Sequence, residues 1–314
     1  MCIVLILSVL TGACKNQTID TGRSYFNEHI YVDRCSFSRT TIFVGEGGVM
    51  YVNDRSYNIN ITNSMFNNCS SSSQAGAISC ISKNMVLFRV CAFKCITANY
   101  YAFSYSNSLN DHIFKYLSVT MCSHNHIGEI SVRIVNGYQN IDDCNSSLNI
   151  MKGYSSFSFY DPIYLSSKYC SFAHNIVTTS RTVEYWGSSG LVTYSNFIHN
   201  NSPTSLGVLY LSGSGTYDLK FCVFRENQNT LCFANSGTMR ISHSYLSHQG
   251  TLKSGTGSLL TPTNVSFVTM NTIPIVFFKT FLCHADLEMP FITVDLKPTT
   301  RKANVYFLFV ILNV

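Results

Sequence analysis

Charged residues are scarce in this sequence. Only 12% of its 314 residues are Asp, Glu, Lys or Arg, about half of what soluble domains usually carry. The formal net charge is +5, and no run of Lys or Arg is longer than Arg301-Lys302. Because nucleic-acid binding requires a concentrated basic surface, we expect no DNA or RNA partner.

Long hydrophobic runs are also missing. The apolar segments Cys2 to Leu10 and Tyr306 to Val314 are both far shorter than the roughly 20 residues of a membrane-spanning helix. Phe (22) and Tyr (19) are abundant, and apolar and polar residues alternate in segments such as 58–62. That alternation is strand periodicity. The composition therefore predicts an all-β protein.

A short unit recurs along the chain, and such repeats determine a whole architecture when they stack. The six clearest copies are centred on Phe37, Phe66, Phe93, Phe172, Phe197 and Phe224, and weaker copies align on Cys122, Leu148, Tyr245 and Phe267. From the first copy to the last, nine intervals cover 230 residues, or about 26 residues each. One coil of a parallel β-helix has this length. We expect a single-stranded right-handed parallel β-helix, or solenoid, of about ten coils over residues 15–271.

The unit has a simple physical interpretation. A Cys or Ser stands two residues before the Phe, so both side chains face the same side of an extended strand, which we take to be the lumen. The Asn three residues after the Phe lies at a turn, where its amide can bridge adjacent coils. A second, Gly-containing signature occurs at 47–50, 75–78 and 206–209 and predicts tight turns.

The pairing of the Gly-containing box with a Phe-x-x-Asn box resembles the chlamydial polymorphic outer-membrane proteins, and is similar to trichomonad surface repeat proteins. The resemblance covers roughly residues 35 to 270. The copies that begin at Cys170, Ser195 and Cys222 fit the second box fully. The resemblance implies a β-helical protein at the cell surface with a role in adhesion.

The N-terminus supports a secreted or cell-surface location. Residues 1–14 have an apolar core followed by Thr11-Gly12-Ala13, which predicts a signal peptide; a first buried strand is the alternative. The thirteen cysteines form no compact disulfide framework, and their odd number leaves at least one unpaired. Six sequons mark candidate glycosylation sites at Asn16, Asn60, Asn68, Asn145, Asn200 and Asn264.

Residues 272–314 depart from the repeat. We expect an atypical C-terminal cap that ends in a buried strand, because solenoids close their cores with irregular terminal units. The alternative is a truncated membrane-anchor region, since Arg301-Lys302 precedes the last apolar run. Membrane association would then depend on a missing anchor.

The sequence offers no convincing catalytic constellation. Glycoside cleavage on a β-helix needs two carboxylates across a groove, and the one adjacent acid pair, Asp142-Asp143, faces opposite sides of an extended strand. Cys122, His124 and His126 alternate like metal ligands, yet a lumen and turn position explains them better. We predict no catalytic residues, no metal and no cofactor.

The single tryptophan, Trp186, and its neighbour Tyr185 are the candidate binding residues, as a platform on which a sugar could stack. The sequence thus predicts a non-enzymatic secreted or cell-surface protein whose long faces bind host-cell or extracellular glycans or proteins. The alternative is a carbohydrate-active lyase or hydrolase, or an inactive relative, with a groove near Trp186 and Asp142.

Overall fold

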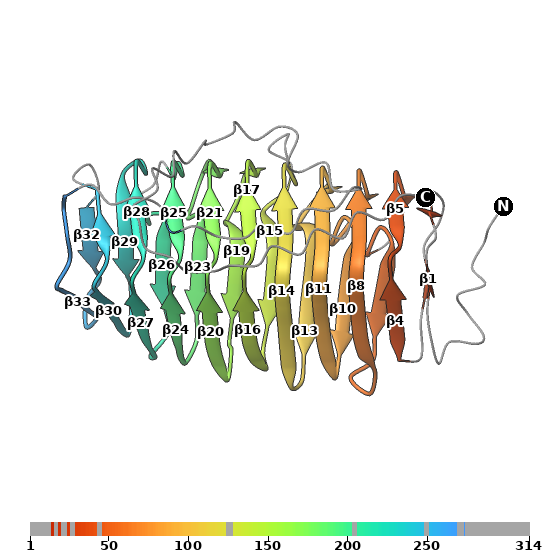
Figure 1. Ribbon diagram of the computed structural model, residues 1–314, viewed down its shortest axis with the longest axis horizontal. Coiled ribbons are helices and arrows are strands. Elements are labelled where there is room, and N and C mark those ends of the chain that lie inside the picture. The colour runs from red at the N-terminus through yellow and green to blue at the C-terminus, as the bar shows by residue number, and fades with distance from the viewer. Residues whose placement is uncertain are drawn as a thin grey trace, which may run out of the picture.

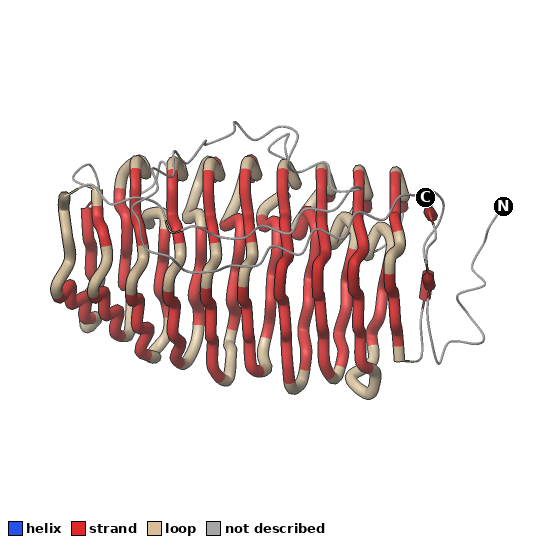
Figure 2. Tube along the Cα trace, in the orientation of Figure 1, coloured by secondary structure: helices blue, strands red, loops and turns tan. Residues whose placement is uncertain are grey.

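The computed structural model describes residues 14–15, 18–19, 24–25, 29–42, 46–123, 128–202, 206–247, 251–268 and 273. Every regular element in these ranges is a β-strand, and all strand pairs are parallel (Figures 1 and 2). The chain winds into a solenoid of about eight turns, slightly fewer than expected. The all-β class and the parallel solenoid architecture are confirmed. No helix that could cross a membrane occurs in the described part of the chain.

Two large sheets run along the solenoid axis. The ten-stranded sheet contains β3 (Ser24–Tyr25), β7 (Met50–Asn53), β10 (Ile78–Ser82), β13 (Tyr101–Ser108), β15 (Ile130–Val135), β19 (Ser155–Tyr160), β23 (Val183–Trp186), β26 (Leu209–Ser212), β29 (Thr230–Ala234) and β32 (Thr251–Ser254). The 18-stranded sheet contains β1 (Cys14–Lys15), β2 (Thr18–Ile19), β4 (Ile30–Asp33), β5 (Ser36–Ser38), β8 (Asn58–Asn67), β11 (Asn84–Phe93), β14 (Asp111–Thr120), β16 (Tyr138–Asp142), β17 (Asn145–Ser147), β20 (Tyr164–Lys168), β21 (Ser171–Ala173), β24 (Ser189–Thr193), β25 (Asn196–Ile198), β27 (Thr216–Lys220), β28 (Val223–Arg225), β30 (Thr238–Ser242), β31 (Tyr245–Leu246) and β33 (Leu259–Thr263). Short strands complete some coils: β6 (Thr41–Ile42), β9 (Ser70–Ser71) and β12 (Ile96–Thr97), and β18 (Ile150–Met151) with β22 (Ile176–Val177).

The predicted phenylalanine column lies in the lumen. Phe37, Phe66, Phe172, Phe197 and Phe224 are all buried. Rings of adjacent coils stack, with centroids 4.8 Å apart for Phe37 and Phe66 and 4.5 Å apart for Phe197 and Phe224. Stacked aromatic pairs add stability beyond the area that they bury.

Phe93 is not a member of this column, which corrects the sequence prediction. Strand register places Ala92 directly beside Phe66, whereas Phe93 pairs with Asn67 and faces outward. Phe93 packs with Met65 and Cys91 in a separate small cluster. The triplet that ends in Phe93 matches the repeat in sequence. In the structure, however, Phe93 lies one residue beyond the position of the phenylalanine column.

The weaker copies are also out of register with the column, by one to three residues. The column runs through Val119, Ser146 and Leu246 rather than through Cys122, Leu148 or Tyr245. Phe267 remains 48% exposed. The register is set by a left-handed corner residue that precedes each lumen triplet, and these corner residues are Arg34, Asn63, Arg89, Tyr116, Asp143, Tyr169, Tyr194, Phe221, His243 and Asn264.

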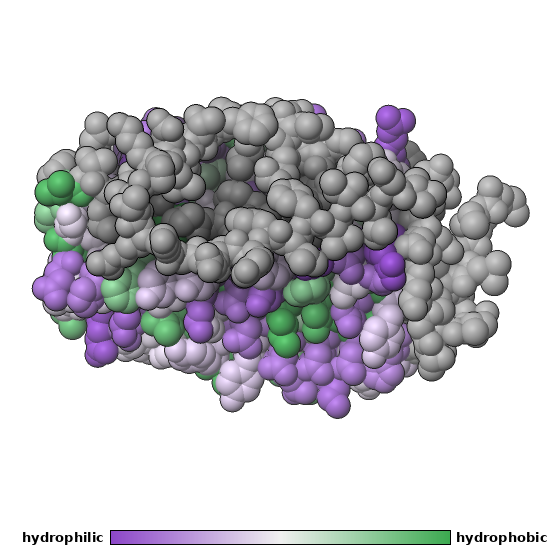
Figure 3. All heavy atoms as spheres, in the orientation of Figure 1, coloured by the Kyte–Doolittle hydropathy of each residue, from purple (hydrophilic) through white to green (hydrophobic). Residues whose placement is uncertain are grey.

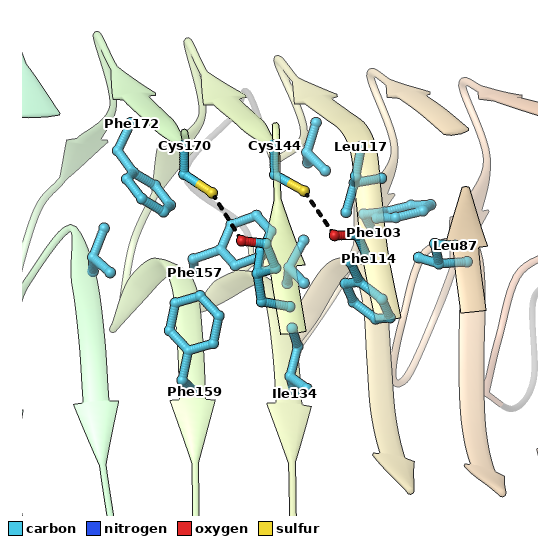
Figure 4. Close-up of a cluster of buried hydrophobic side chains, with 14 of the residues drawn as sticks. Leu87, Phe103, Phe114, Leu117, Ile134, Cys144, Phe157, Phe159, Cys170 and Phe172 are labelled. Atoms are coloured by element: carbon cyan, nitrogen blue, oxygen red, sulfur yellow. Dashed lines mark hydrogen bonds between the residues drawn. The ribbon is translucent and has the colours of Figure 1, made fainter. Parts of the chain in front are cut away.

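Buried cysteine thiols occupy the small-residue positions of the lumen, as the repeat predicts. Cys144 Sγ lies 3.5 Å from the carbonyl oxygen of Phe114, and Cys170 Sγ lies 3.5 Å from that of Ile141 (Figure 4). Each thiol therefore donates to a carbonyl of the preceding coil. Burial raises the pKa of Cys144 well above its usual value, so the thiol stays protonated.

An asparagine ladder joins four successive coils. Asn149 Nδ2 donates to Asn175 Oδ1 (2.9 Å), Asn175 Nδ2 to Asn200 Oδ1 (3.1 Å), and Asn200 Nδ2 to Asn227 Oδ1 (3.0 Å). All four side chains are buried. The predicted role of these amides, to bridge equivalent positions of adjacent coils, is confirmed.

We expect Asn175→Ala to lower the free energy of unfolding by about 2 to 4 kcal/mol, because it leaves buried ladder partners unsatisfied. Its Oδ1 accepts from both the backbone and side-chain nitrogens of Asn149, and its Nδ2 also donates to the Ser146 carbonyl. Urea denaturation followed by circular dichroism measures the loss. Asn140→Ala, on the exposed face of β16, is the control; equal midpoints for the two variants would contradict this role.

His112 is a buried histidine in the lumen, with Nδ1 3.0 Å from Ser106 Oγ and Nε2 3.0 Å from the Val135 carbonyl. Burial lowers its pKa from 6.5 to about 4. Between these values the unfolded chain binds a proton that the folded chain does not. The part of the folding stability that depends on His112 is therefore highest above pH 6.5 and falls as the pH drops toward 4.

The expected loss over that range is about 3 kcal/mol. His112→Met should remove this part of the pH dependence, since Met85 already occupies the same register position in the neighbouring coil. Urea midpoints measured from pH 7 to pH 4 test this. An unchanged difference between pH 7 and pH 4 in His112→Met would show that His112 does not cause it.

Candidate functional site

The outward face of the ten-stranded sheet carries two rows of side chains, because alternate strand residues face away from the lumen. Strand register aligns Tyr105, Arg133, Ser158, Glu184 and Tyr210 in the first row. The second row aligns Asn107, Val135, Tyr160, Trp186 and Ser212. Strands β15, β19 and β23 at the middle of the stack supply the central members of both rows (Figure 1).

A hollow of about 320 Å³ opens on this face. Its lining is Tyr100, Tyr101, Glu129, Ile130, Arg133, Tyr154, Tyr160, Arg181, Glu184 and Trp186. A second hollow of about 400 Å³ shares Tyr100, Glu129 and Tyr154 with the first and adds Lys152, Asn99 and Thr179. We call the two together the aromatic groove. Figure 3 draws the other side of the solenoid, over the 18-stranded sheet, where small apolar patches lie between hydrophilic residues.

The aromatic groove exists because residue size changes abruptly along the first row. Ser158 stands between Arg133 and Glu184, so a short side chain separates two long ones. In the second row Tyr160 and Trp186 stack, with ring centroids 5.5 Å apart and planes 22° apart. The stacked pair forms one wall of the hollow.

Arg133 contacts this wall through Tyr160, which belongs to the next coil. The guanidinium carbon lies 4.4 Å from the ring centroid of Tyr160, a distance at which a cation is attracted by the ring face. In the described part of the chain, this ring contact is the interaction of the Arg133 side chain, which forms no ion pair and no side-chain hydrogen bond there. Its N–H groups are therefore available to a ligand.

Arg181 is in the opposite situation. It forms a buried ion pair with Glu184, whose other carboxylate oxygen accepts a hydrogen bond from Ser158 Oγ at 2.9 Å. The Arg181 guanidinium also lies near the rings of Tyr154 (5.4 Å) and Tyr210 (4.5 Å). The charges of Arg181 and Glu184 compensate each other in the floor of the groove.

Trp186 and Tyr185 have separate locations, which corrects the expected shared platform. Trp186 is partly exposed and lines the groove. Tyr185 is fully buried in the lumen, where its ring stacks on Phe159 (5.1 Å) and Tyr217 (5.3 Å). Consecutive strand residues face opposite sides, so only one of the two can reach a ligand.

Asp142 and Asp143 do not belong to the groove either. Asp142 ends β16 in the 18-stranded sheet, in register with Lys115 and Lys168. Asp143 occupies a left-handed corner (φ 53°), and burial raises its pKa despite the nearby Lys115. Asp142 therefore lies on a different sheet from Trp186 and lines neither of the two hollows.

The carboxylates of the groove are Glu129 and Glu184, which sequence reasoning missed. They lie 55 positions apart and line the same hollow because only one coil, that of β19, separates their two coils. Aligning the outward rows coil by coil is the operation that finds such a pair, and it requires the register that the sequence leaves open.

The remaining candidate residues are distributed as follows. Cys122 is buried in the lumen, while His124 and His126 lie outside the described residues. Among the described residues, no three His, Cys, Asp or Glu side chains are grouped to hold a metal ion. Of the sequon asparagines, Asn145 and Asn200 are buried, Asn60 is partly buried, Asn68 and Asn264 are exposed, and Asn16 lies outside the described residues.

Burial removes Asn145 and Asn200 from the expected glycosylation sites, since a glycan does not fit a closed position. Asn200 belongs to the asparagine ladder, and Asn145 Nδ2 donates to the hydroxyls of Ser118 and Ser147. The geometry of the aromatic groove is the main basis for a functional conclusion. No family model, curated protein or solved structure matches this chain.

Proposed function

We propose that this protein is a non-enzymatic, secreted or cell-surface β-solenoid that binds carbohydrate through the aromatic groove. The observation that carries the proposal is the Tyr160–Trp186 stack beside Arg133 in a hollow of about 320 Å³. Sugar rings present apolar C–H faces that pack on aromatic rings, and their hydroxyls bond to charged and amide groups. The groove provides both kinds of partner.

The shape of the groove fits a chain of sugars better than a single one. The two hollows share Tyr100, Glu129 and Tyr154, so the groove continues along several coils. Stacked coils repeat about every 4.8 Å, which gives an elongated ligand successive contacts. Extended surfaces of this kind are the usual binding faces of solenoids.

Two further observations support a location outside the cytosol. Cys35 and Cys91 each take part in a disulfide bond, and disulfides persist mainly in oxidising compartments. The sequon residues Asn68 and Asn264 are exposed, so both are open to glycosylation. The signal-peptide and anchor hypotheses concern residues 1–14 and 272–314, of which all but Cys14 and Ile273 lie outside the described part.

Removal of the tryptophan ring tests the binding function. We expect Trp186→Ala to weaken glycan binding about tenfold or more, because it removes the groove's largest aromatic surface. Screening the purified protein on a glycan array and titrating the best ligand by calorimetry measures the effect.

Tyr185→Phe is the matched control. The adjacent Tyr185 hydroxyl is buried without a hydrogen-bond partner in the described structure, so its removal should leave both affinity and unfolding midpoint unchanged. Failure of the wild-type protein to bind any glycan, or equal affinities in the two variants, would refute the proposal.

A carbohydrate-active enzyme is the second candidate, favoured by one observation: Glu129 and Glu184 line the same hollow. Glycoside hydrolysis uses two carboxylates across a groove. The Glu184 carboxylate is already engaged by the Arg181 ion pair and the Ser158 hydrogen bond. Glu129 would then have to act as the general acid.

Cleavage assays separate the two candidates. We expect the protein to bind polysaccharides without releasing new reducing ends or unsaturated products. If products do form, Glu129→Gln should abolish them while Asp142→Asn, in the other sheet, leaves them unchanged. That result would replace the binding function with an enzymatic one.

A further inference from the structure

We infer that the ligand of the aromatic groove is an acidic sugar, whose carboxylate pairs with Arg133 while its ring packs against Trp186. This inference rests on the carbohydrate-binding function proposed above and adds the chemical class of the ligand. It starts from a difference between the two arginines that line the same hollow.

Arg181 already forms an ion pair, whereas Arg133 forms none within the described residues. The Arg181 guanidinium is paired with Glu184 and also donates to Ser180 Oγ. Arg133, in contrast, contacts the face of Tyr160 and forms no ion pair or side-chain hydrogen bond within the described residues. Stacking satisfies the face of a guanidinium but not its edge, which carries five N–H donors.

The geometry of that edge selects a planar anion. The Tyr160 ring holds the guanidinium carbon 4.4 Å from its centroid, and the N–H groups of a guanidinium bind a carboxylate in a two-point manner. Arg133 is partly buried, so the pair would form in a medium of lower dielectric constant than water, where such contacts are stronger.

The charge balance of the groove favours an anionic ligand over a neutral one. The charged side chains lining the two hollows are Arg133, Arg181, Lys152, Glu129 and Glu184. Since Arg181 and Glu184 compensate each other, two cations remain against one carboxylate. Lys152 is exposed in the second hollow, where it can meet a second acidic unit of the same sugar chain.

The Tyr160–Trp186 wall distinguishes a sugar from other carboxylates. Its stacked rings present apolar edges beside Arg133, against which a pyranose ring that carries a carboxylate can pack. Glu129, shared by both hollows, can accept hydrogen bonds from hydroxyl groups. An acidic peptide would use Arg133 but would leave this combination largely unused.

The test compares acidic sugars with their own methyl esters, which keep the ring and lose the charge. Oligogalacturonate, a hyaluronan fragment and sialyl-lactose, each with its methyl ester, are titrated against the wild-type full chain by calorimetry. We expect at least one acid to bind about tenfold or more tightly than its ester, because a charge-assisted pair is lost on esterification.

Three variants assign the effect to the Arg133 side chain. Arg133→Gln should bind acid and ester equally, with the residual affinity of the stacked ring. Arg133→Lys, which keeps the charge but not the planar fork, should retain only part of the preference. Arg240→Gln, at a 60% exposed side chain near Asp218, is the control and should bind like the wild-type protein.

The possible failures are distinguishable. If every acid and ester pair binds equally well, the acidic-sugar inference is wrong and carbohydrate binding stands. A preference for acids that persists in Arg133→Gln would also overturn it, because the charge would then be recognised elsewhere. If no sugar binds and an acidic peptide does, both the inference and the proposed function fail.

Discussion

In-register parallel pairing between coils is the constraint on which the rest of this structure depends. Each residue lies beside its equivalent in the next coil at about 4.8 Å, so every lumen position becomes a column that favours side chains able to stack on themselves. Flat rings and carboxamides meet this condition. The Phe197–Phe224 stack and the Asn175–Asn200 amide pair are two solutions to the same geometric problem.

The asparagine ladder also shows how a polar column is kept inside an apolar lumen. Each buried amide bonds both to the next amide and to a backbone carbonyl of the preceding coil, as Asn200 does with Asn227 and Phe172. Toward the N-terminus the same column continues as Cys122, Cys95 and Cys69, and the Cys95 thiol lies 3.6 Å from the carbonyl of Phe66. A thiol is apolar enough to be buried without full hydrogen bonding, so the N-terminal coils keep the column with fewer polar demands.

The sequence predicts the class, the coil length and the ladder because these depend on residue types that recur at every turn. It does not predict the register, because the left-handed corner that sets it is occupied by chemically unrelated residues such as Arg89, Asp143 and Phe221. A shift of one residue exchanges the inner and outer faces. Without the register, the sequence predicts Phe93 in the lumen and Tyr185 on the surface, and both residues lie on the other side of the wall. The groove depends on comparing coils, so Glu129 and Arg133 carried no signal in the linear sequence.

The location of the aromatic groove follows from the same stacking rule. Where like residues stack outside the solenoid, the surface is continuous: the exposed column that contains Tyr169, Tyr194 and Phe221 has ring centroids 5.2 and 5.0 Å apart. On the ten-stranded sheet the row changes from Arg133 to Ser158 to Glu184 within three coils. The side chains of such a row do not stack on their neighbours, and they leave a hollow with opposite charges at its edges. A solenoid gains stability when like side chains of adjacent coils pack on each other. The row of Arg133, Ser158 and Glu184 lacks such pairs, and selection for binding at this groove best explains why these residues are there.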